Sequence, residues 1–156
     1  MNIHQWAERH QIAAPAMQEL LHLLGLGEPS ITAPNANTTE AGVQQATRLR
    51  AAQLGRRLWR NNSGATQDET GRVIRFGLGN DSAQSNKVFK SSDLIGITPT
   101  QCTCGRVWGL FTAIEVKAPG WHITPGDARA QAQLNFINLV NAFGGIGKFL
   151  TNAEDL

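Results

Sequence analysis

The residues of this chain best suited to chemistry stand at the ends of two predicted strands. An apolar run that ends at Ile114 continues into Glu115, Val116 and Lys117. Because side chains alternate along a strand, Glu115 and Lys117 point to the same face, opposite to Val116. Upstream, Asp93 begins another apolar run and offers a second carboxylate. Two carboxylates and a lysine are suited to holding a divalent cation against a phosphodiester.

A divalent cation addresses both obstacles to phosphodiester hydrolysis, which are repulsion of the nucleophile and a poor leaving group. Mg²⁺ and Mn²⁺ prefer oxygen ligands, so we expect Asp93, Glu115 and the backbone carbonyl of Val116 to bind the metal. Lys117 would lie beside them. Since nearby carboxylates favour its charged form, we expect Lys117 to orient water and stabilise transition-state charge rather than accept a proton.

A carboxylate two residues before a lysine is also what an ordinary salt bridge at a strand end produces. Taken alone, Glu115 and Lys117 are therefore consistent with a structural protein that has no DNA affinity and no metal dependence. The remaining features of the chain separate these two interpretations.

The distribution of charge indicates a nucleic-acid partner. The stretch 48–90 holds nine basic residues and three acidic ones, although the net charge of the whole chain is only +2. Such a stretch suits a phosphate backbone, because each neutralised phosphate releases counterions. The alternative is a solvated surface on which arginine stems cover apolar neighbours. The candidate DNA-binding residues are Arg56, Arg57, Arg60, Lys87, Lys90 and Trp121, the last of which could stack on an unpaired base.

The N-terminal residues predict a separate helical appendage. Pro15 suits a first helical turn, and several leucines follow before Gly25. Residues 26–37 are rich in Pro, Gly, Asn and Thr, which predicts a linker. We therefore predict an appendage and linker over 1–37 and one domain over 38–156, a length that can bury a hydrophobic core.

The predicted domain begins with a helix from Thr38 or Thr39 to about Gly55. This helix places Glu40 in its first turn, where the helix dipole favours a carboxylate. A second helix is expected to open at Gly126-Asp127 and to end at Gly144-Gly145. Strands are expected at 57–60, 72–77, 93–98, 107–117 and 146–150, with a turn at 61–64, a loop over 78–91 and another loop that holds Pro99 and both cysteines. This order predicts an α/β fold with a mixed sheet and helices packed on it.

The cysteine spacing and the hydropathy of the chain indicate in which cellular compartment the protein is expected. Cys102 and Cys104 are separated by one residue, a spacing that we expect to be poor for a disulfide, so a reducing compartment is expected. Zinc normally needs four ligands, and no second cysteine pair exists to complete such a site. No stretch approaches the length of a membrane span, and the N-terminus lacks the pattern of a signal peptide. We expect a soluble protein that is not secreted and has no membrane partner.

The ordered motifs of residues 38–156 resemble the virus-type replication-repair nuclease (VRR-NUC) branch of the PD-(D/E)XK nuclease superfamily. Ser92 stands where the superfamily name has a proline, a position that shapes a turn and binds no metal. The first 37 residues lie outside the resemblance. The matching pieces are Glu40, 58–65, 92–96, 111–117, 133–136, 144–145 and 152–156.

The resemblance implies a restriction-endonuclease-like core of order αβββαβ and assigns roles to single residues. It implies metal binding by Asp93 and Glu115, a catalytic Lys117 and an active-site glutamine on the following helix. That glutamine is Gln131 or Gln133, and the spacing to the following phenylalanine and glycine pair fits Gln133 better. Glu40 corresponds to an acidic residue that can approach the metal, while its position at a helix start is explained equally well by the helix dipole.

The resemblance further implies an Mg²⁺- or Mn²⁺-dependent endodeoxyribonuclease that prefers branched DNA, such as a Holliday junction or a flap. Stand-alone members of this group resemble phage-encoded proteins that form homodimers, so the expected location is the cytoplasm of a bacterial host. A catalytically inert DNA-binding module with the same fold is the alternative.

Overall fold

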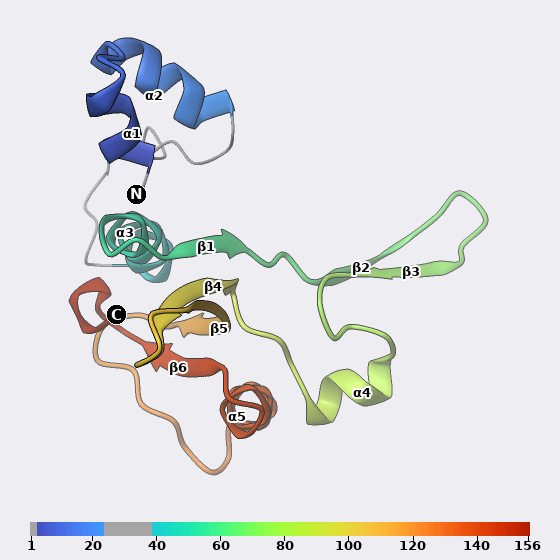
Figure 1. The fold of residues 1–156 in the computed structure, drawn as a ribbon. Helices are drawn as coiled ribbons and strands as arrows, with labels where there is room; N and C mark the ends of the chain where they lie inside the picture. The colour runs from blue at the N-terminus through green and yellow to red at the C-terminus, as the bar shows by residue number, and fades with distance from the viewer. Residues whose placement is uncertain (1–2, 24–38) are drawn as a thin grey trace. The chain divides into compact units, whose positions relative to one another are not determined.

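The computed structural model describes residues 3–23 and 39–156. The chain divides into two compact units, Met1–Thr32 and Ala33–Leu156, and each is described by itself (Figure 1). The linker predicted at 26–37 lies outside the described residues. No helix among the described residues is long and apolar enough to cross a membrane.

The first unit contains two short helices, α1 (Ile3–Arg9) and α2 (Ala14–Leu23). Pro15 lies in the first turn of α2, where its missing N–H would have had no helical partner. Among the described residues of this unit, Ala7 of α1 and Met17 of α2 are the buried apolar side chains. The helical residues expected before Gly25 therefore form two helices joined by a short turn.

The second unit is built on a four-stranded mixed sheet in the order β1-β4-β5-β6. The strand β5 is antiparallel to β4 and parallel to β6, so the chain crosses over between β5 and β6. The helix α5 forms this crossover, as a parallel pair requires. The strands are β1 (Arg57–Arg60), β4 (Leu94–Gln101), β5 (Val107–Val116) and β6 (Ile146–Leu150). The predicted α/β fold with a mixed sheet flanked by helices is confirmed.

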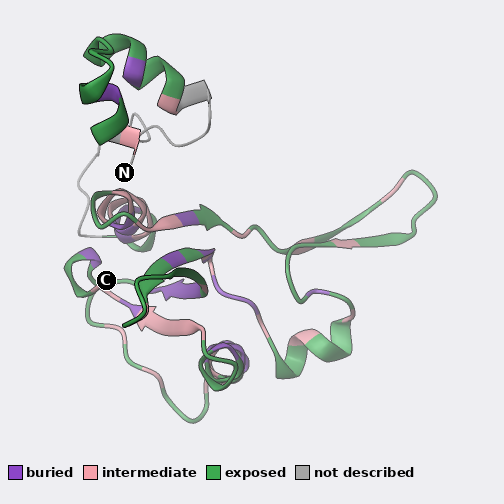
Figure 2. Cartoon of the chain, in the orientation of Figure 1, coloured by how far each residue is buried: buried purple, intermediate pink, exposed green. Residues whose placement is uncertain are grey.

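The helices α3 (Glu40–Gln53) and α5 (Ala128–Ala142) cover opposite faces of the sheet. Alternate residues of β5 point to these two faces, and its second half, residues 112–116, is buried throughout (Figure 2). Ala113 packs with Phe136 and Val140 of α5. The larger core on the α3 side consists of Val43, Ala51, Leu58, Leu94, Ile114, Val116 and Leu150. Each buried Leu, Ile or Val contributes roughly 1.5–3 kcal/mol of hydrophobic free energy.

Local signals fix where both covering helices begin. The hydroxyl of Thr39 accepts a hydrogen bond from the Gly42 amide at 3.1 Å, which makes Thr39 the N-cap of α3. Asp127 caps α5 in the same way through the Ala130 amide at 2.9 Å. Gly144 follows α5 with a φ of 80°, a conformation that glycine adopts without strain.

A segment inserted between β1 and β4 differs most from the prediction. A two-stranded hairpin, β2 (Gly64–Gln67) and β3 (Val73–Phe76), extends away from the main sheet (Figure 1). A short helix, α4 (Ala83–Val88), follows where we expected only a loop. The prediction of a loop over 78–91 is wrong, since Ser82 caps a helix there. The sequence did not reveal this helix because its residues show no apolar period. The turn expected at 61–64 is likewise shorter, since Gly64 already belongs to β2.

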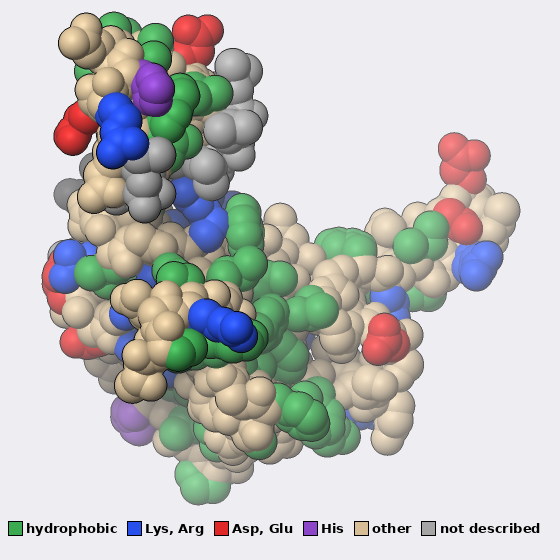
Figure 3. All heavy atoms as spheres, in the orientation of Figure 1, with side chains coloured by type: hydrophobic (Ala, Val, Ile, Leu, Met, Phe, Trp, Pro, Cys, Tyr) green, Lys and Arg blue, Asp and Glu red, His purple; other side chains and the backbone are tan. Residues whose placement is uncertain are grey.

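The hairpin has no hydrophobic core of its own among the described residues. Val73, Ile74 and Phe76 are all exposed, and the two strands pair only with each other. Apolar side chains lie along it and acidic ones at its outer end (Figure 3), where Asp68 and Glu69 form the turn. The Asn80 amide donates to the carbonyls of Gly64 and Phe76 at 2.7 and 2.8 Å, which ties the base of the hairpin together.

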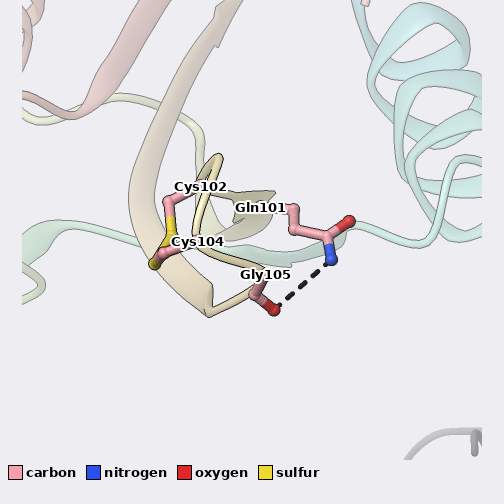
Figure 4. The surroundings of a disulfide bond; sticks show 4 residues. All are labelled: Gln101, Cys102, Cys104 and Gly105. Atoms are coloured by element: carbon pink, nitrogen blue, oxygen red, sulfur yellow. Dashed lines mark hydrogen bonds between the residues drawn. A yellow bond between two sulfur atoms is a disulfide. The ribbon is translucent and has the colours of Figure 1, made fainter.

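The loop between β4 and β5 corrects the prediction about the cysteines. Cys102 and Cys104 form a disulfide, drawn in Figure 4. Their Cα atoms lie 5.3 Å apart, within the ordinary range, because a tight turn over residues 102–105 folds the chain back between them. In this turn the Gly105 amide donates to the Cys102 carbonyl at 3.0 Å. The expectation of a reducing compartment therefore loses its basis. Pro99 lies inside β4 rather than in this loop.

Candidate active site

Glu115 and Lys117 lie side by side at the end of the central strand, on the face that α5 covers. The Lys117 ammonium is 2.8 Å from Glu115 Oε1. Glu115 is 1% exposed and Lys117 is 9% exposed, so this ion pair is almost removed from water. The Lys117 amide donates to the Leu150 carbonyl at 2.9 Å, which continues the pairing of β5 with β6 beyond Val116. The backbone therefore holds both side chains at a fixed spacing.

Gln133 joins this pair from α5. It lies on the same face of the helix as Phe136, Ile137 and Val140, which pack toward the sheet. Its side chain is 1% exposed and donates through Nε2 to Glu115 Oε1. Its Oε1 accepts a hydrogen bond from Lys117 Nζ at 3.0 Å. One amide thus orients both members of the ion pair.

The structure distinguishes between the two glutamines that the sequence left open. The Gln131 side chain donates to the Thr124 carbonyl at 3.2 Å and takes no part in the cluster. Gln133 is two residues further along α5, which turns its side chain by about half a helical circle toward the sheet. The cluster is therefore formed by Gln133 together with Glu115 and Lys117.

Asp93 joins from the segment that leads into β4. Its Oδ2 accepts the Val116 amide at 3.0 Å, and its own amide donates to Glu115 Oε2 at 3.2 Å. These reciprocal bonds place the two carboxylates next to each other across the strand ends. Because the N–H and C=O of one strand residue point the same way, the Val116 carbonyl also faces the Asp93 side.

Asn61 holds this segment in place and was not among the predicted site residues. Its amide donates to the Asp93 carbonyl at 2.7 Å. Its side-chain Nδ2 donates to Ser91 Oγ and to the Ser92 carbonyl, each at 2.9 Å. Its Oδ1 accepts the Leu78 amide at 3.2 Å, at the base of the inserted segment. Asn61 therefore determines the path of the backbone that carries Asp93.

The pKa of Glu115 is raised from an ordinary 4.5 to about 7. Burial is the main cause of this increase, and the neighbouring charge of Asp93 is the second. The hydrogen bond and charge of Lys117 act in the opposite direction without cancelling the increase. The Glu115 carboxyl is therefore only partly ionised near neutral pH. A cation placed between Asp93 and Glu115 would relieve this repulsion and favour the ionised form.

This increase predicts how the free energy of unfolding of the metal-free protein depends on pH. The folded state binds more protons than the unfolded state between the ordinary and the raised pKa of Glu115, so stability falls as pH rises from about 4.5 through about 7. The upper limit of the slope is about 1.4 kcal/mol per pH unit. Denaturant titrations in chelator should show this fall in the parent protein and not in Glu115→Gln. Equal slopes in both proteins would contradict the assignment.

The donor atoms of the site fit a hard divalent cation. Carboxylate oxygens from Asp93 and Glu115 and the carbonyl of Val116 are the ligands that Mg²⁺ and Mn²⁺ prefer. Among the described residues, no three or more His, Cys, Asp or Glu side chains are grouped so that they could hold a metal ion by themselves. A cation here would consequently keep several waters, as Mg²⁺ usually does.

The predicted basic residues divide into those beside the cluster and those away from it. Arg60 and Lys90 line a hollow of about 260 Å³ that has Asp93 in its wall. Arg56 instead donates to the Leu156 carbonyl at 2.9 Å. Arg57 is half-buried on β1, and Lys87 is exposed on α4.

Trp121 lies next to Lys117. Lys117 Nζ is 5.4 Å from the centroid of the Trp121 ring, within the range of a cation–π contact. The ring also contacts Phe149, with centroids 4.9 Å apart, and it is half-buried. The structure thus places Trp121 as a cover over the lysine rather than as a freely projecting ring.

Glu40 is exposed in the first turn of α3, and no described contact joins it to Asp93 or Glu115. Gln44 lies one turn later on the same face of α3 and lines the hollow beside Asp93. Glu40 therefore lies on the face of α3 that includes Gln44, and it does not belong to the hydrogen-bonded cluster of Asp93, Glu115, Lys117 and Gln133. The cap formed by Thr39 accounts for the helix start on its own.

Sequence reasoning missed several residues that line the hollow. Their common property is that only the pairing of distant segments brings them together. Arg129 had a weak signal, since it lies two residues after Asp127, the capping residue of α5. The missed residues are Gln44, Asn61, Asn62, Ser63 and Arg129.

The two glutamines of α5 provide a matched test of the cluster. If the site holds a metal and cuts DNA, Gln133→Ala should lower metal affinity or cleavage by roughly 10- to 100-fold, as loss of an orienting partner typically does. Gln131→Ala should stay close to the parent, because its side chain bonds to a loop carbonyl. Cleavage rates and metal titrations of both variants measure this, and equal losses would contradict the distinction.

Comparison with known proteins adds no family to this description. No family model, no curated protein and no solved structure matches the chain. The fold and the site define a mixed α/β protein that holds two carboxylates, a lysine and a glutamine at the end of its central strand.

Proposed function

We propose that the chain is a metal-dependent DNA endonuclease of the VRR-NUC type within the PD-(D/E)XK superfamily. The observation that carries the proposal is the convergence of Asp93, Glu115, Lys117 and Gln133 from three separate elements on one buried point. An ordinary surface ion pair would need neither the second carboxylate nor the buried glutamine. Desolvation makes such a buried arrangement costly for stability alone, which supports a role in chemistry.

In the proposed reaction each residue has a task that follows from its contacts. Asp93 and Glu115, with the Val116 carbonyl, would hold Mg²⁺ or Mn²⁺. When bound, the ion would polarise the phosphoryl oxygen and acidify a water. Lys117 donates hydrogen bonds to a carboxylate and an amide oxygen, so it acts as a cation that offsets charge developing on the phosphate. Gln133 keeps Lys117 and Glu115 in their orientations.

The preference for branched DNA and the homodimer belong to the same proposal. Both follow from the resemblance to stand-alone VRR-NUC proteins. A single domain of this size contacts one strand well, whereas two sites related by a twofold axis would reach both strands of a junction or flap. The resemblance also implies the cytoplasm of a bacterial host, a location that the Cys102–Cys104 disulfide does not support.

The test incubates the full chain with labelled linear, flap and four-way-junction DNA. Cleavage is compared in Mg²⁺, in Mn²⁺ and in chelator. Cleavage that needs the metal and prefers a branched substrate is the expected result. Binding without cleavage in any metal would instead favour the inert DNA-binding module, and the absence of both would favour a structural protein.

A further inference from the structure

The hollow beside Asp93 collects positive charge from three separate elements. Arg60 comes from the end of β1, Lys90 from the segment before β4, and Arg129 from the first turn of α5. The pairing of β1 with β4 places Arg60 opposite Leu94, directly after Asp93. Among the described residues that line the hollow, Asp93 is the only one with a carboxylate. The hollow is therefore positive on balance.

These cationic side chains have no partner within the described part of the chain. Neither Arg60 nor Lys90 nor Arg129 forms an ion pair or a side-chain hydrogen bond with another described residue. Other arginines of the domain do have partners, since Arg50 pairs with Glu154 and Arg56 bonds to a carbonyl. Like charges that converge without a counterion repel each other, and an anion in the hollow removes that repulsion.

The backbone around the hollow is held in place. The Lys90 amide donates to the Ala132 carbonyl at 3.0 Å, which fixes Lys90 against α5. Asn61 fixes the neighbouring segment 91–93 through its bonds to Ser91, Ser92 and Asp93. The remaining lining groups, Gln44, Asn62 and Ser63, add neutral donors suited to phosphate oxygens.

The size and lining indicate which part of a nucleic acid would bind. At about 260 Å³ the hollow is smaller than typical ligand pockets of roughly 300 Å³ or more, and it suits a phosphate group rather than a whole nucleotide. Glu115, Lys117 and Gln133 do not line it, so it is distinct from the point where cleavage would occur. Asp93 belongs to both, which makes the two places neighbours.

We propose that the hollow is a phosphate subsite that binds the DNA phosphate next to the scissile one, through Arg60, Lys90 and Arg129. This inference rests on the proposed nuclease function. Its task is to set the register of the strand, so that the neighbouring phosphate arrives at Asp93 and Glu115. Arg129 is the part of the subsite that was not among the predicted DNA-binding residues.

The test measures binding of a labelled DNA duplex to the full chain in chelator, as a function of salt, for Arg60→Ala, Lys90→Ala and Arg129→Ala. Each variant should bind roughly 10-fold more weakly, and the slope of log K against log salt should fall by about 0.9 for each lost contact. Arg106→Ala, an exposed arginine of the disulfide loop, serves as the matched control and should keep the slope. Thermal melting checks that every variant is folded.

The binding assay separates this inference from the proposed function. If the variants lose slope but no protein cuts DNA, the nuclease proposal fails, and the hollow remains a DNA phosphate site without a scissile neighbour. If the parent cuts DNA and all three variants keep the slope of Arg106→Ala, the subsite is overturned. In an active protein the variants should raise KM by roughly 10-fold and leave kcat within about threefold, whereas an unchanged KM would also overturn the inference.

Discussion

Asp93→Asn is expected to lose about a thousandfold in Mg²⁺-dependent DNA cleavage while binding DNA in chelator as tightly as the parent. The substitution keeps an oxygen that can accept the Val116 amide bond, so the strand ends should remain in place. It removes one of the two charges that would hold the cation, and metal catalysis supplies several kcal/mol of transition-state stabilisation. Single-turnover rates at increasing Mg²⁺ and Mn²⁺ measure the loss, which high metal concentration should partly restore.

The control for this prediction is Asp81→Asn, which removes an exposed carboxylate outside the cluster. It should leave both the cleavage rate and the metal dependence unchanged. Cleavage by Asp93→Asn at the parental rate and metal concentration would remove Asp93 from the site. A loss of DNA binding in chelator would show that Asp93 acts on the fold or on the substrate rather than on the metal.

Lys117→Met should lower kcat by roughly 10²- to 10³-fold, the usual effect of removing one donor that stabilises transition-state charge. Methionine preserves most of the length of the side chain but contributes no charge beside Glu115. Because Lys117 is one of the groups that lower the Glu115 pKa, its loss should raise that pKa further. Cleavage by the variant should therefore recover in part as pH rises above 7, whereas added metal at pH 7 should recover less than it does for Asp93→Asn.

The readout that separates these explanations is the response to pH and to metal, measured on the same DNA. A Lys117→Met protein with parental kcat would exclude the lysine from the chemistry. Recovery by metal alone, equal to that of Asp93→Asn, would assign Lys117 to metal affinity instead of charge stabilisation. DNA binding in chelator as tight as that of the parent would confirm that the variant is folded.

The main sheet was predictable because its elements carry their own local signals. The alternation around Glu115 and Lys117 follows from strand geometry alone, and α5 has a capping Asp127 and a terminating Gly144. Within the inserted segment the strand expected at 72–77 is confirmed as β3, whereas β2 and α4 lack such signals. Their apolar residues are exposed, so no period marks a buried face, and the fold of this segment depends on side-chain bonds such as those of Asn80.

The candidate site shows the same division between local and distant information. Glu115 and Lys117 are joined by two-residue spacing, and Gln133 is placed by the helical stripe that includes Phe136. Asn61 and Arg129 meet Asp93 only because β1 pairs with β4 and α5 packs nearby. The disulfide shows the limit of a spacing rule, since the turn over residues 102–105 decides how closely the two cysteines approach.

Asn61 and Ser91 bond to each other at the two ends of the inserted segment, thirty residues apart in the chain. The segment therefore leaves and re-enters the sheet at nearly the same point, and this hydrogen bond joins its two ends. A closed loop of this kind can change in length or be exchanged without altering the register of β1 with β4. Changes of length or sequence should therefore be tolerated best in this segment, because Asp93 keeps its position when they occur.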